Sequence, residues 1–551
     1  MKVIIVGGVA GGASAAARLR RLDESAEIIL LERGDHISFA NCGLPYYIGG
    51  EITEKESLFL QTPESFRARF NVDARVRNEV VQINPQKKTV RIKNLSDGTV
   101  YEETYDKLIL SPGAEPLKPP FPGSDDPRIF TLRNVPDAFQ IRNFIDANHP
   151  QRVLVVGGGY IGVEMAENLC NAGLEVTIAE LSDHLIAPLD FDMACVVHQY
   201  LRSKGIRLML KTGVKAFIPS ETEISAEIGD ELYSFDFVVL SVGVRPETSL
   251  AKNAGLKLNP KGAVLVDAYM RTSDENIYAV GDAIEITNFV TGKPGYIPLA
   301  GPANKQGRIA ADNICGLKRS YSGTQGSAVL KVFEMTVATT GLNEVAAIAS
   351  GIETEKVYVC PSSHASYYPG ASAMFFKLIF EKSNGKILGA EIVGFEGVDK
   401  RCDVIATAIR GGMTVFDLTS LELCYAPPFS SAKDPVNMAG YVAENVLLGK
   451  VKQSFWHDYE ALRRDDNAIL LDVRTRYEYQ QGAIDGTVLI PVDELRENLD
   501  QLDRSKKIYV NCQSGQRSYL ACRILMQHGY DCYNLAGGYL LYNIVKSELN
   551  N

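Results

Sequence analysis

Two cysteines stand in segments whose residue types and spacing could support sulfur chemistry. Cys42 lies within Ser38-Phe-Ala-Asn-Cys-Gly-Leu-Pro-Tyr-Tyr47, and the next cysteine along the chain is Cys170. A single thiol enters two-electron chemistry only by pairing with another atom, either the oxygen of a sulfenic acid or the sulfur of a bound small thiol. Cys512 opens the six-residue segment Cys512–Arg517. This segment separates a predicted strand, 507–511, from a predicted helix that ends near 528.

The Cys512 segment is typical of an anion-binding loop. Backbone N–H groups point inward in a loop between a strand and a helix, and they favour a thiolate or a persulfide anion. Arg517 adds a positive charge to the same loop. We therefore predict Cys512 and Arg517 as catalytic residues.

The remaining cysteines carry no such pattern. Ten cysteines among 551 residues are too few for a disulfide scaffold, and no C-x-x-C pair or Cys/His cluster has zinc-ligand spacing. We expect no metal site and a reduced, cytoplasmic protein. Eight cysteines are interpreted as small buried side chains. For Cys522 and Cys532 a role as a resolving thiol stays open.

A glycine turn near the start of the chain predicts a dinucleotide site. A predicted strand at 2–6 leads into Gly7–Gly12, then into a helix at 13–22 and a strand at 28–31 that ends at Glu32. In this order of elements the helix N-terminus faces a pyrophosphate and the acid accepts hydrogen bonds from a ribose. Val9 replaces the middle glycine of the motif. The predicted cofactor contacts are Gly7, Gly8, Ala10, Gly11, Gly12, Glu32 and Arg33.

The same pattern recurs with a full G-x-G-x-x-G. A predicted strand at 152–156 precedes Gly157–Gly162, and a helix at 163–172 and a strand at 176–179 lead to Glu180. Two such units imply two dinucleotides. Glu180 would repel a 2′-phosphate, which favours NADH, although loop cations leave NADPH open. The predicted contacts are Gly157, Gly159, Tyr160, Ile161, Gly162 and Glu180.

Composition excludes several classes of protein. The chain has a net charge of −10, with 46% apolar and 23% charged residues. These values suit a globular protein and give no basic footprint for nucleic acid. No apolar run approaches the roughly 20 residues of a membrane span. The length predicts about three or four domains.

Residues 1 to about 446 resemble the pyridine nucleotide–disulfide oxidoreductases. The strand at 274–282 ends in Gly-Asp, like the second flavin motif of that family, and 105–114 and 237–246 resemble its connecting motifs. The resemblance implies FAD at the first glycine turn and NADH at the second. It adds Gly113, Asp282 and Gly243 to the cofactor contacts, and it implies that Tyr160 covers the flavin until NADH arrives.

The Cys42 segment resembles one branch of this family. NADH oxidases, NADH peroxidases and coenzyme A–disulfide reductases share Ser-Phe-x-x-Cys-Gly, whereas Pro45-Tyr46-Tyr47 and 423–435 resemble the coenzyme A–disulfide reductases. This implies a homodimer in which Tyr425 and Lys433 of one subunit reach coenzyme A at the other. Tyr367 is the second implied tyrosine, with Tyr368 as the alternative.

The resemblance also implies an anion-binding site for coenzyme A, whose phosphate groups need Arg or Lys. Ser14, Arg18 and Arg21 have helical spacing on one face, and Asn304 stands where a relative has His. The implied substrate contacts are Ser14, Arg18, Arg21, Ser38, Asn41, Arg75, Asn304 and Lys433.

Residues 455 to about 539 resemble a single rhodanese domain. The segment contains Asp472-Val-Arg474, the Cys512 loop and Ala536-Gly-Gly538, and Gly482-Ala-Ile484 replaces the usual Gly-His-Ile. The loop from Cys to Arg is one residue shorter than in the related phosphatases, which favours sulfane sulfur over phosphate.

We therefore predict an α/β chain with two Rossmann-like domains, an α+β dimerisation domain and a C-terminal α/β rhodanese domain. The predicted boundaries are 1–117 with 247–322 for FAD, 118–246 for NAD(P)H, 323–449 for dimerisation and 450–551 for rhodanese. The predicted reaction is the NADH-driven, FAD-dependent reduction of coenzyme A disulfide, coenzyme A persulfide or polysulfide at Cys42, with Cys512 supplying sulfane sulfur. The alternatives are an NADH oxidase or peroxidase that uses a Cys42 sulfenic acid, and a flavin redox sensor without turnover.

Overall fold

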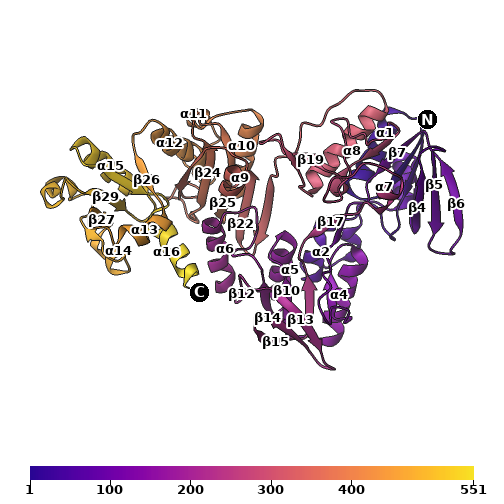
Figure 1. Cartoon of the computed structure of the whole chain (residues 1–551), viewed down its shortest axis with the longest axis horizontal. Coiled ribbons are helices and arrows are strands. Elements are labelled where there is room, and N and C mark those ends of the chain that lie inside the picture. The colour runs from indigo at the N-terminus through magenta and orange to yellow at the C-terminus, as the bar shows by residue number, and fades with distance from the viewer. Residues whose placement is uncertain (551) are drawn as a thin grey trace. The chain divides into compact units, whose positions relative to one another are not determined.

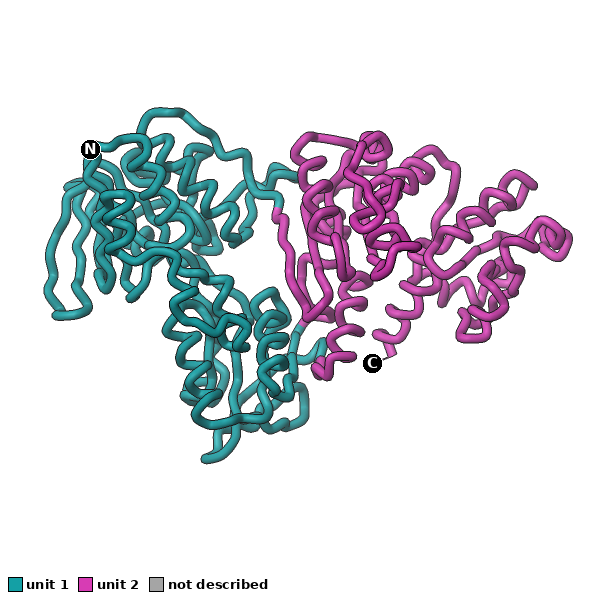
Figure 2. Tube along the Cα trace, turned by 180° about the vertical axis from the view of Figure 1, so that it is seen from behind, with its two compact units in different colours: residues 1–181, 209–325 teal, residues 182–208, 326–551 magenta. Residues whose placement is uncertain are grey.

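The computed structural model describes residues 1–550, and Figure 1 labels its helices and strands. The chain forms two compact units, which Figure 2 colours separately. The first unit comprises 1–181 and 209–325, and the second comprises 182–208 and 326–551. The segment 182–208 falls within the range predicted for the NAD(P)H-binding domain, yet it packs with the second unit.

A parallel five-stranded sheet organises the amino-terminal part of the first unit. Its strand order is β18-β7-β1-β2-β3, and the apolar side chains of these strands form a buried core. Helices α1 and α8 pack so closely that a Cβ on Gly307 would lie 2.2 Å from the Gly11 carbonyl oxygen. The elements are β1 (Lys2–Val6), α1 (Ala10–Leu22), β2 (Glu27–Leu31), α2 (Leu44–Ile48), α3 (Pro63–Phe70), β3 (Asp73–Arg75), β4 (Asn78–Asn84), β5 (Thr89–Asn94), β6 (Val100–Thr104), β7 (Lys107–Leu110), α7 (Ser249–Asn253), β18 (Ile277–Ala279), β19 (Ile286–Thr287), β20 (Pro294–Gly295) and α8 (Ala300–Ile314).

A second parallel sheet in this unit repeats the arrangement. Its strand order is β12-β11-β10-β16-β9, and the short pair β8–β17 is antiparallel. Both predicted glycine-turn units therefore form. The elements are β8 (Ala114–Pro116), β9 (Ile129–Thr131), α4 (Val135–Asn148), β10 (Arg152–Val156), α5 (Tyr160–Asn171), β11 (Glu175–Ala179), β12 (Arg207–Met209), β13 (Val214–Pro219), β14 (Ile224–Ile228), β15 (Glu231–Phe235), β16 (Phe237–Leu240) and β17 (Val244–Pro246).

Helices α1 and α5 begin three residues earlier than the sequence predicts. They start at Ala10 and Tyr160, so residues of the glycine turns themselves enter the helices. The predicted strands 2–6 and 152–156 coincide with β1 and β10. The turns therefore place the first helical N–H groups directly against the ends of these strands.

An antiparallel sheet and a parallel sheet build the second unit. The antiparallel sheet has the order β21-β22-β25-β24-β23, and the parallel sheet has the order β26-β30-β29-β27-β28. The elements are α6 (Phe191–Ser203), β21 (Ala328–Val332), β22 (Met335–Gly341), α9 (Glu344–Ala349), β23 (Thr354–Val359), β24 (Phe375–Glu381), β25 (Ile387–Gly394), α10 (Val398–Arg410), α11 (Val415–Thr419), α12 (Pro435–Leu447), β26 (Lys452–Ser454), α13 (Tyr459–Leu462), β27 (Ala468–Asp472), α14 (Arg476–Gln480), β28 (Val488–Leu489), β29 (Lys507–Asn511), α15 (Gln516–Gln527), β30 (Cys532–Leu535) and α16 (Gly538–Leu549).

The helices are short relative to a bilayer. Within residues 1–550, none is both long enough and apolar enough to span a membrane.

Candidate active site

The first glycine turn is fixed by contacts that no larger residue allows. Gly7 has φ +97°, and a Cβ on it would lie 2.1 Å from the Ser111 carbonyl oxygen. A Cβ on Gly12 would lie 1.8 Å from the Gly7 carbonyl oxygen. Glu32 accepts the backbone N–H of Gly8 at 2.9 Å, which ties the acid at the end of β2 to the turn. No side chain caps the start of α1, so its first N–H groups fit the pyrophosphate of FAD.

The second glycine turn has the same geometry. Gly157 has φ +103°, and a Cβ on Gly162 would lie 2.0 Å from the Gly157 carbonyl oxygen. Glu180 accepts the backbone N–H of Gly158 at 2.7 Å. A Cβ on Gly159 would meet no atom within 4 Å, and no side chain caps α5. The open space beside Gly159 therefore fits the pyrophosphate of a nicotinamide dinucleotide.

The other predicted flavin contacts lie in loops around the first sheet. Asp282 stands in a 3-10 turn, and burial raises the pKa of its carboxyl group. The side chain of Gln306 accepts the N–H of Gly281 at 2.8 Å and fixes that turn. Gly113 and Gly243 both have positive φ, +77° and +107°. The guanidinium of Arg33, another predicted flavin contact, donates to the carboxylate of Glu247 at 3.3 Å.

Cys42 lies in a 3-10 turn, Asn41–Gly43, directly before α2. The residue is exposed, yet neighbouring atoms desolvate the thiol, and this raises its pKa; the charges of Glu164 and Asp282 raise the pKa further. Burial, with a smaller effect of Glu167, raises the pKa of Glu164 to about 7. Glu164 is a site residue that the sequence reasoning missed, although it lies in the helix of the second glycine motif.

A pocket of about 350 Å³ beside α1 brings four predicted substrate contacts together. Ser14, Arg21, Ser38 and Asn304 line it, and the Ser14 hydroxyl donates to the Asn304 side-chain oxygen. The sequence reasoning missed its remaining lining residues, which are Ala13, Ala17, Gln61, Phe66, Phe70 and Arg308. Arg308 lies one helical turn after Asn304 on α8, and this spacing was an available signal.

Two other predicted cations do not line this pocket. Arg18 pairs with Asp312 at 2.6 Å. Arg75 pairs with Asp73 at 2.7 Å and with Glu103 at 2.8 Å. Each guanidinium is therefore already neutralised by a carboxylate of the same unit.

The predicted tyrosines meet each other. The hydroxyl oxygens of Tyr367 and Tyr425 lie 3.1 Å apart, and the two residues are 74% and 48% exposed. Tyr368 instead packs its ring against His364, with ring centroids 5.7 Å apart. Lys433 is exposed.

Arg401 supports the two loops that carry Tyr367 and Tyr425. It is 1% exposed, pairs with Asp434 at 3.0 Å, and donates to the carbonyl of Ser363 at 2.9 Å and to the hydroxyl of Ser430 at 3.1 Å. Removing one partner of such a buried pair leaves an uncompensated charge. Arg401 is thus a positioning residue that no local sequence pattern marks.

The Cys512 loop surrounds its sulfur with donors. Cys512 is buried, and its Sγ accepts the N–H of Gly515 at 3.1 Å and the hydroxyl of Ser518 at 3.2 Å. Arg517 forms a two-point ion pair with Glu478. The arrangement stabilises negative charge on sulfur. Ser518 and Glu478 are contributors that the sequence reasoning did not assign.

Arg474 and Gly538 form the walls of this loop. The buried Arg474 pairs with Asp472 at 2.8 Å, and its guanidinium lies 4.1 Å from the ring centroid of Tyr539. A Cβ on Gly538 would lie 2.7 Å from the carbonyl oxygens of Cys512 and Gln513. Glycine is thus required at the start of α16, where that helix meets the Cys512 loop.

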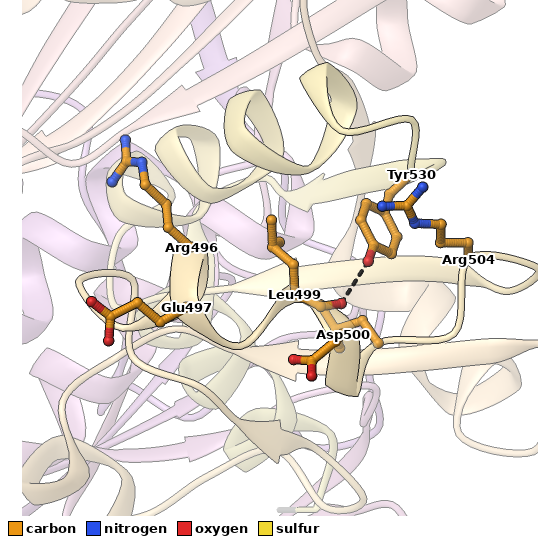
Figure 3. A pocket seen from close by; sticks show the side chains of 7 residues that line it. Arg496, Glu497, Leu499, Asp500, Arg504 and Tyr530 are labelled. Carbon is orange, nitrogen blue, oxygen red and sulfur yellow. Dashed lines mark hydrogen bonds between the residues drawn. The ribbon is translucent and has the colours of Figure 1, made fainter.

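A larger hollow, of about 470 Å³, lies in the rhodanese domain between the turns at 496–504 and the residue Tyr530 before β30 (Figure 3). The Tyr530 hydroxyl donates to the Leu499 carbonyl at 2.5 Å at its edge. Its lining residues are Arg496, Glu497, Leu499, Asp500, Leu502, Arg504 and Tyr530. Since no thiol lines it, this hollow is separate from the sulfur chemistry of Cys512.

Comparison with known families agrees with these two kinds of site. Residues 1–307 match the pyridine nucleotide-disulphide oxidoreductase family, and 327–435 match its dimerisation domain. The chain belongs to the pyridine nucleotide–disulfide oxidoreductases. Residues 456–543 match the rhodanese-like domain, so this oxidoreductase also carries a rhodanese domain. The predicted α/β fold class is confirmed.

Similar proteins cover most or all of this oxidoreductase. A coenzyme A disulfide reductase of Staphylococcus aureus (strain bovine RF122 / ET3-1) is 37% identical over 446 residues, which are 80% of this chain and 100% of that protein. The crystal structure of reduced Bacillus anthracis CoADR-RHD is 50% identical, with a TM-score of 0.97 over 99% of this chain and 98% of that chain. An NAD-dependent persulfide reductase from A. fulgidus is 37% identical, with a TM-score of 0.93 over 98% and 100%.

Proposed function

We propose that this oxidoreductase is a homodimer that uses NADH and FAD to reduce coenzyme A disulfide or coenzyme A persulfide, and polysulfide, at Cys42. The observation that carries the proposal is the pocket beside α1, which joins Arg21 and Arg308 to polar groups. One wall of this pocket, Ser38, belongs to the segment that carries Cys42. Two guanidinium groups suit a phosphorylated thiol, and the sulfur of such a bound thiol can serve as the redox partner of Cys42.

Cys42 performs the sulfur exchange in this proposal. Its thiolate attacks the disulfide of the substrate, forms a mixed disulfide with one coenzyme A and releases the other as a thiolate. With coenzyme A persulfide, Cys42 takes the outer sulfur and coenzyme A leaves as a thiolate. FAD held at the first glycine turn would supply the two electrons from NADH that return Cys42 to the thiolate and release the second product. Tyr425 and Tyr367, supplied by the partner subunit, donate hydrogen bonds to the leaving sulfur.

The rhodanese domain supplies sulfur for this reaction. Cys512 accepts sulfane sulfur as a persulfide, which the Gly515 N–H, the Ser518 hydroxyl and Arg517 stabilise, and the sulfur then passes to coenzyme A. We keep the domain boundaries predicted from the sequence, except that 182–208 packs with the second unit.

The test compares acceptors across three variants. Sulfide release from NADH plus coenzyme A persulfide falls to background in Cys42→Ser, whereas Cys512→Ser keeps this activity and loses the supply of sulfur from thiosulfate. Cys315→Ser, at a half-buried cysteine, is the matched control. Full activity of Cys42→Ser would contradict the mechanism.

Mass spectrometry of the purified protein separates the alternatives. A coenzyme A adduct on Cys42 supports the proposal. A sulfenic acid without adduct, together with rapid NADH consumption by oxygen or peroxide, supports an oxidase or peroxidase. A reducible flavin without turnover on any acceptor supports a redox sensor.

A further inference from the structure

Cys360 directly follows β23, the edge strand of the antiparallel sheet, and is half-buried. Side chains two residues apart on a strand point to the same face of the sheet. Lys356, Tyr358 and Cys360 therefore share one face. The function described above leaves this cysteine without a role.

The beginning of the rhodanese domain covers that face. The ring of Phe455 lies 4.4 Å from the Lys356 ammonium and 6.4 Å from the Tyr358 ring. The Gln453 side chain donates to the Lys356 carbonyl at 2.9 Å. The same face that carries Cys360 is thus the docking face for the rhodanese domain.

The direction of the two chains places Cys360 at one particular edge of the rhodanese sheet. Gln453 meets Lys356, and Phe455, two residues later, meets Tyr358, so β26 and β23 advance together. All strands of the rhodanese sheet are parallel, and Cys512 follows β29 at the edge toward which β26 runs. Cys360, two residues after Tyr358, therefore lies at this same edge.

The electrostatics of the two thiols agree with this placement. Burial raises the pKa of Cys360 to about 12, and the charge of Cys512 contributes to the rise. Such an effect requires proximity, because charges interact as the inverse of distance and are screened over longer ranges. The register of the strands puts both thiols at one edge of the docked domain, and the electrostatic effect agrees with that placement.

The docking is held at several points. The Trp456 indole N–H donates to Asp192 at 3.4 Å, and Asp192 also receives the buried Lys377 ammonium at 3.2 Å. Helix α16 is tied to α6 through His198 and Glu548, 3.1 Å apart. The rhodanese domain is therefore tied to α6 near both ends of its own chain.

We propose that Cys360 is a second sulfur-carrying residue, which takes sulfane sulfur from Cys512 and delivers it to the thiol of coenzyme A. The inference rests on the proposed function, since Cys512 must first hold a persulfide. Cys360 begins the loop 360–374 that carries Tyr367, the residue assigned above to the coenzyme A site. Sulfur on Cys360 would already have crossed from the rhodanese domain to the domain that binds the acceptor.

The transfer is balanced without an added oxidant. Cys512–S–SH and Cys360–SH give Cys512–SH and Cys360–S–SH, so one S–S bond breaks, another forms, and the Cys360 proton passes to the Cys512 sulfur. Cys360–S–SH and coenzyme A thiol then give Cys360–SH and coenzyme A persulfide. Cys360 attacks as its thiolate, and the proton that it gives up is the one that the departing Cys512 sulfur accepts.

The experiment loads the full-length holoenzyme with thiosulfate, alkylates it and maps persulfides by mass spectrometry. The wild type carries sulfane sulfur on both Cys512 and Cys360, and Cys512→Ser carries none on Cys360. Cys360→Ser retains the Cys512 persulfide but transfers sulfur to coenzyme A roughly tenfold or more slowly. Cys360→Ala guards against an effect of a buried hydroxyl, and Cys315→Ser is the half-buried control.

Four outcomes overturn the inference. Persulfide confined to Cys512 does so, as does a wild-type transfer rate in both Cys360 variants. Formation of a Cys360–Cys512 disulfide with release of sulfide also does so, because Cys360 would then lose the sulfur instead of carrying it. Failure of Cys512 itself to take sulfur overturns the proposed role of the tail, and the relay with it, so the two failures are distinguishable.

Discussion

Arg517 holds Glu478 in a two-point ion pair, with its terminal nitrogens 2.7 and 2.6 Å from the two carboxylate oxygens. The hydrogen bond from Arg517 is the main reason that the pKa of Glu478 falls to about 2. Glu478 lies on α14 and Arg517 lies in the first turn of α15, so a residue outside the Cys512 loop orients the cation of the loop.

Loss of this cation should slow sulfur uptake at Cys512. We expect Arg517→Gln to lower the rate of thiosulfate-to-cyanide sulfur transfer about 10- to 100-fold, because a charge-assisted hydrogen bond is worth roughly 1.5–3 kcal/mol. Steady-state kinetics measure the loss. Arg476→Gln is the control, since Arg476 lies on α14 with Glu478 but forms a surface ion pair with Glu494. Equal losses in both variants would point to a general effect on stability.

The pyrophosphate site can be tested with two glycines of one motif. Gly159 has φ −73°, which alanine adopts freely, and its Cβ would enter open space. We expect Gly159→Ala to raise the KM for NADH about tenfold by excluding the pyrophosphate, with an unchanged melting temperature. Gly162→Ala should lower the melting temperature, because its Cβ would lie 2.0 Å from a carbonyl oxygen. An unchanged KM in Gly159→Ala would place the dinucleotide elsewhere.

Glu164 should govern the reactivity of Cys42 above pH 7. The pKa of Glu164 is about 7, so its charge is present above that pH, where it raises the pKa of Cys42. We expect Glu164→Gln to speed iodoacetamide labelling of Cys42 at pH 8 by up to about fivefold, since one charge 4 Å away in water is worth roughly 1 kcal/mol. The difference should vanish at pH 6. Glu175→Gln, at an exposed glutamate of the same domain, should label at the wild-type rate at both pH values.

The contact between α6 and α16 should be sensitive to acid. Burial lowers the pKa of His198 below its ordinary 6.5, although Glu548 partly opposes this shift. The folded state thus favours neutral imidazole, and the stability gained is present above pH 6.5 and is lost as the pH falls below it. We expect the melting temperature to fall more between pH 7 and 5.5 in wild type than in His198→Gln. His457→Gln, at an exposed histidine, should retain the wild-type slope.

Local sequence patterns were sufficient to predict the glycine turns and the Cys512 loop, which are shaped by contacts within a short stretch of chain. Gly12 and Gly162 are required by close contacts with the carbonyls of Gly7 and Gly157 in their own turns, so the glycine spacing was enough to predict two dinucleotide folds. The Cys512 loop was predictable for the same reason, because only the four residues 512–515 join β29 to α15 and their N–H groups are turned toward the sulfur.

Tertiary structure decided which charged and sulfur-bearing side chains meet. Arg18 has the helical spacing of a substrate ligand, but it pairs with Asp312, 294 residues away in the sequence. The sequence reasoning assigned no role to Arg308, yet packing places it in the pocket with Ser14 and Arg21. It also treated Cys360 as unremarkable, yet the charge of Cys512 contributes to the raised pKa of the Cys360 thiol. A residue's type and local spacing fix what its side chain can do, whereas its partners are chosen by the packing of elements far apart along the chain.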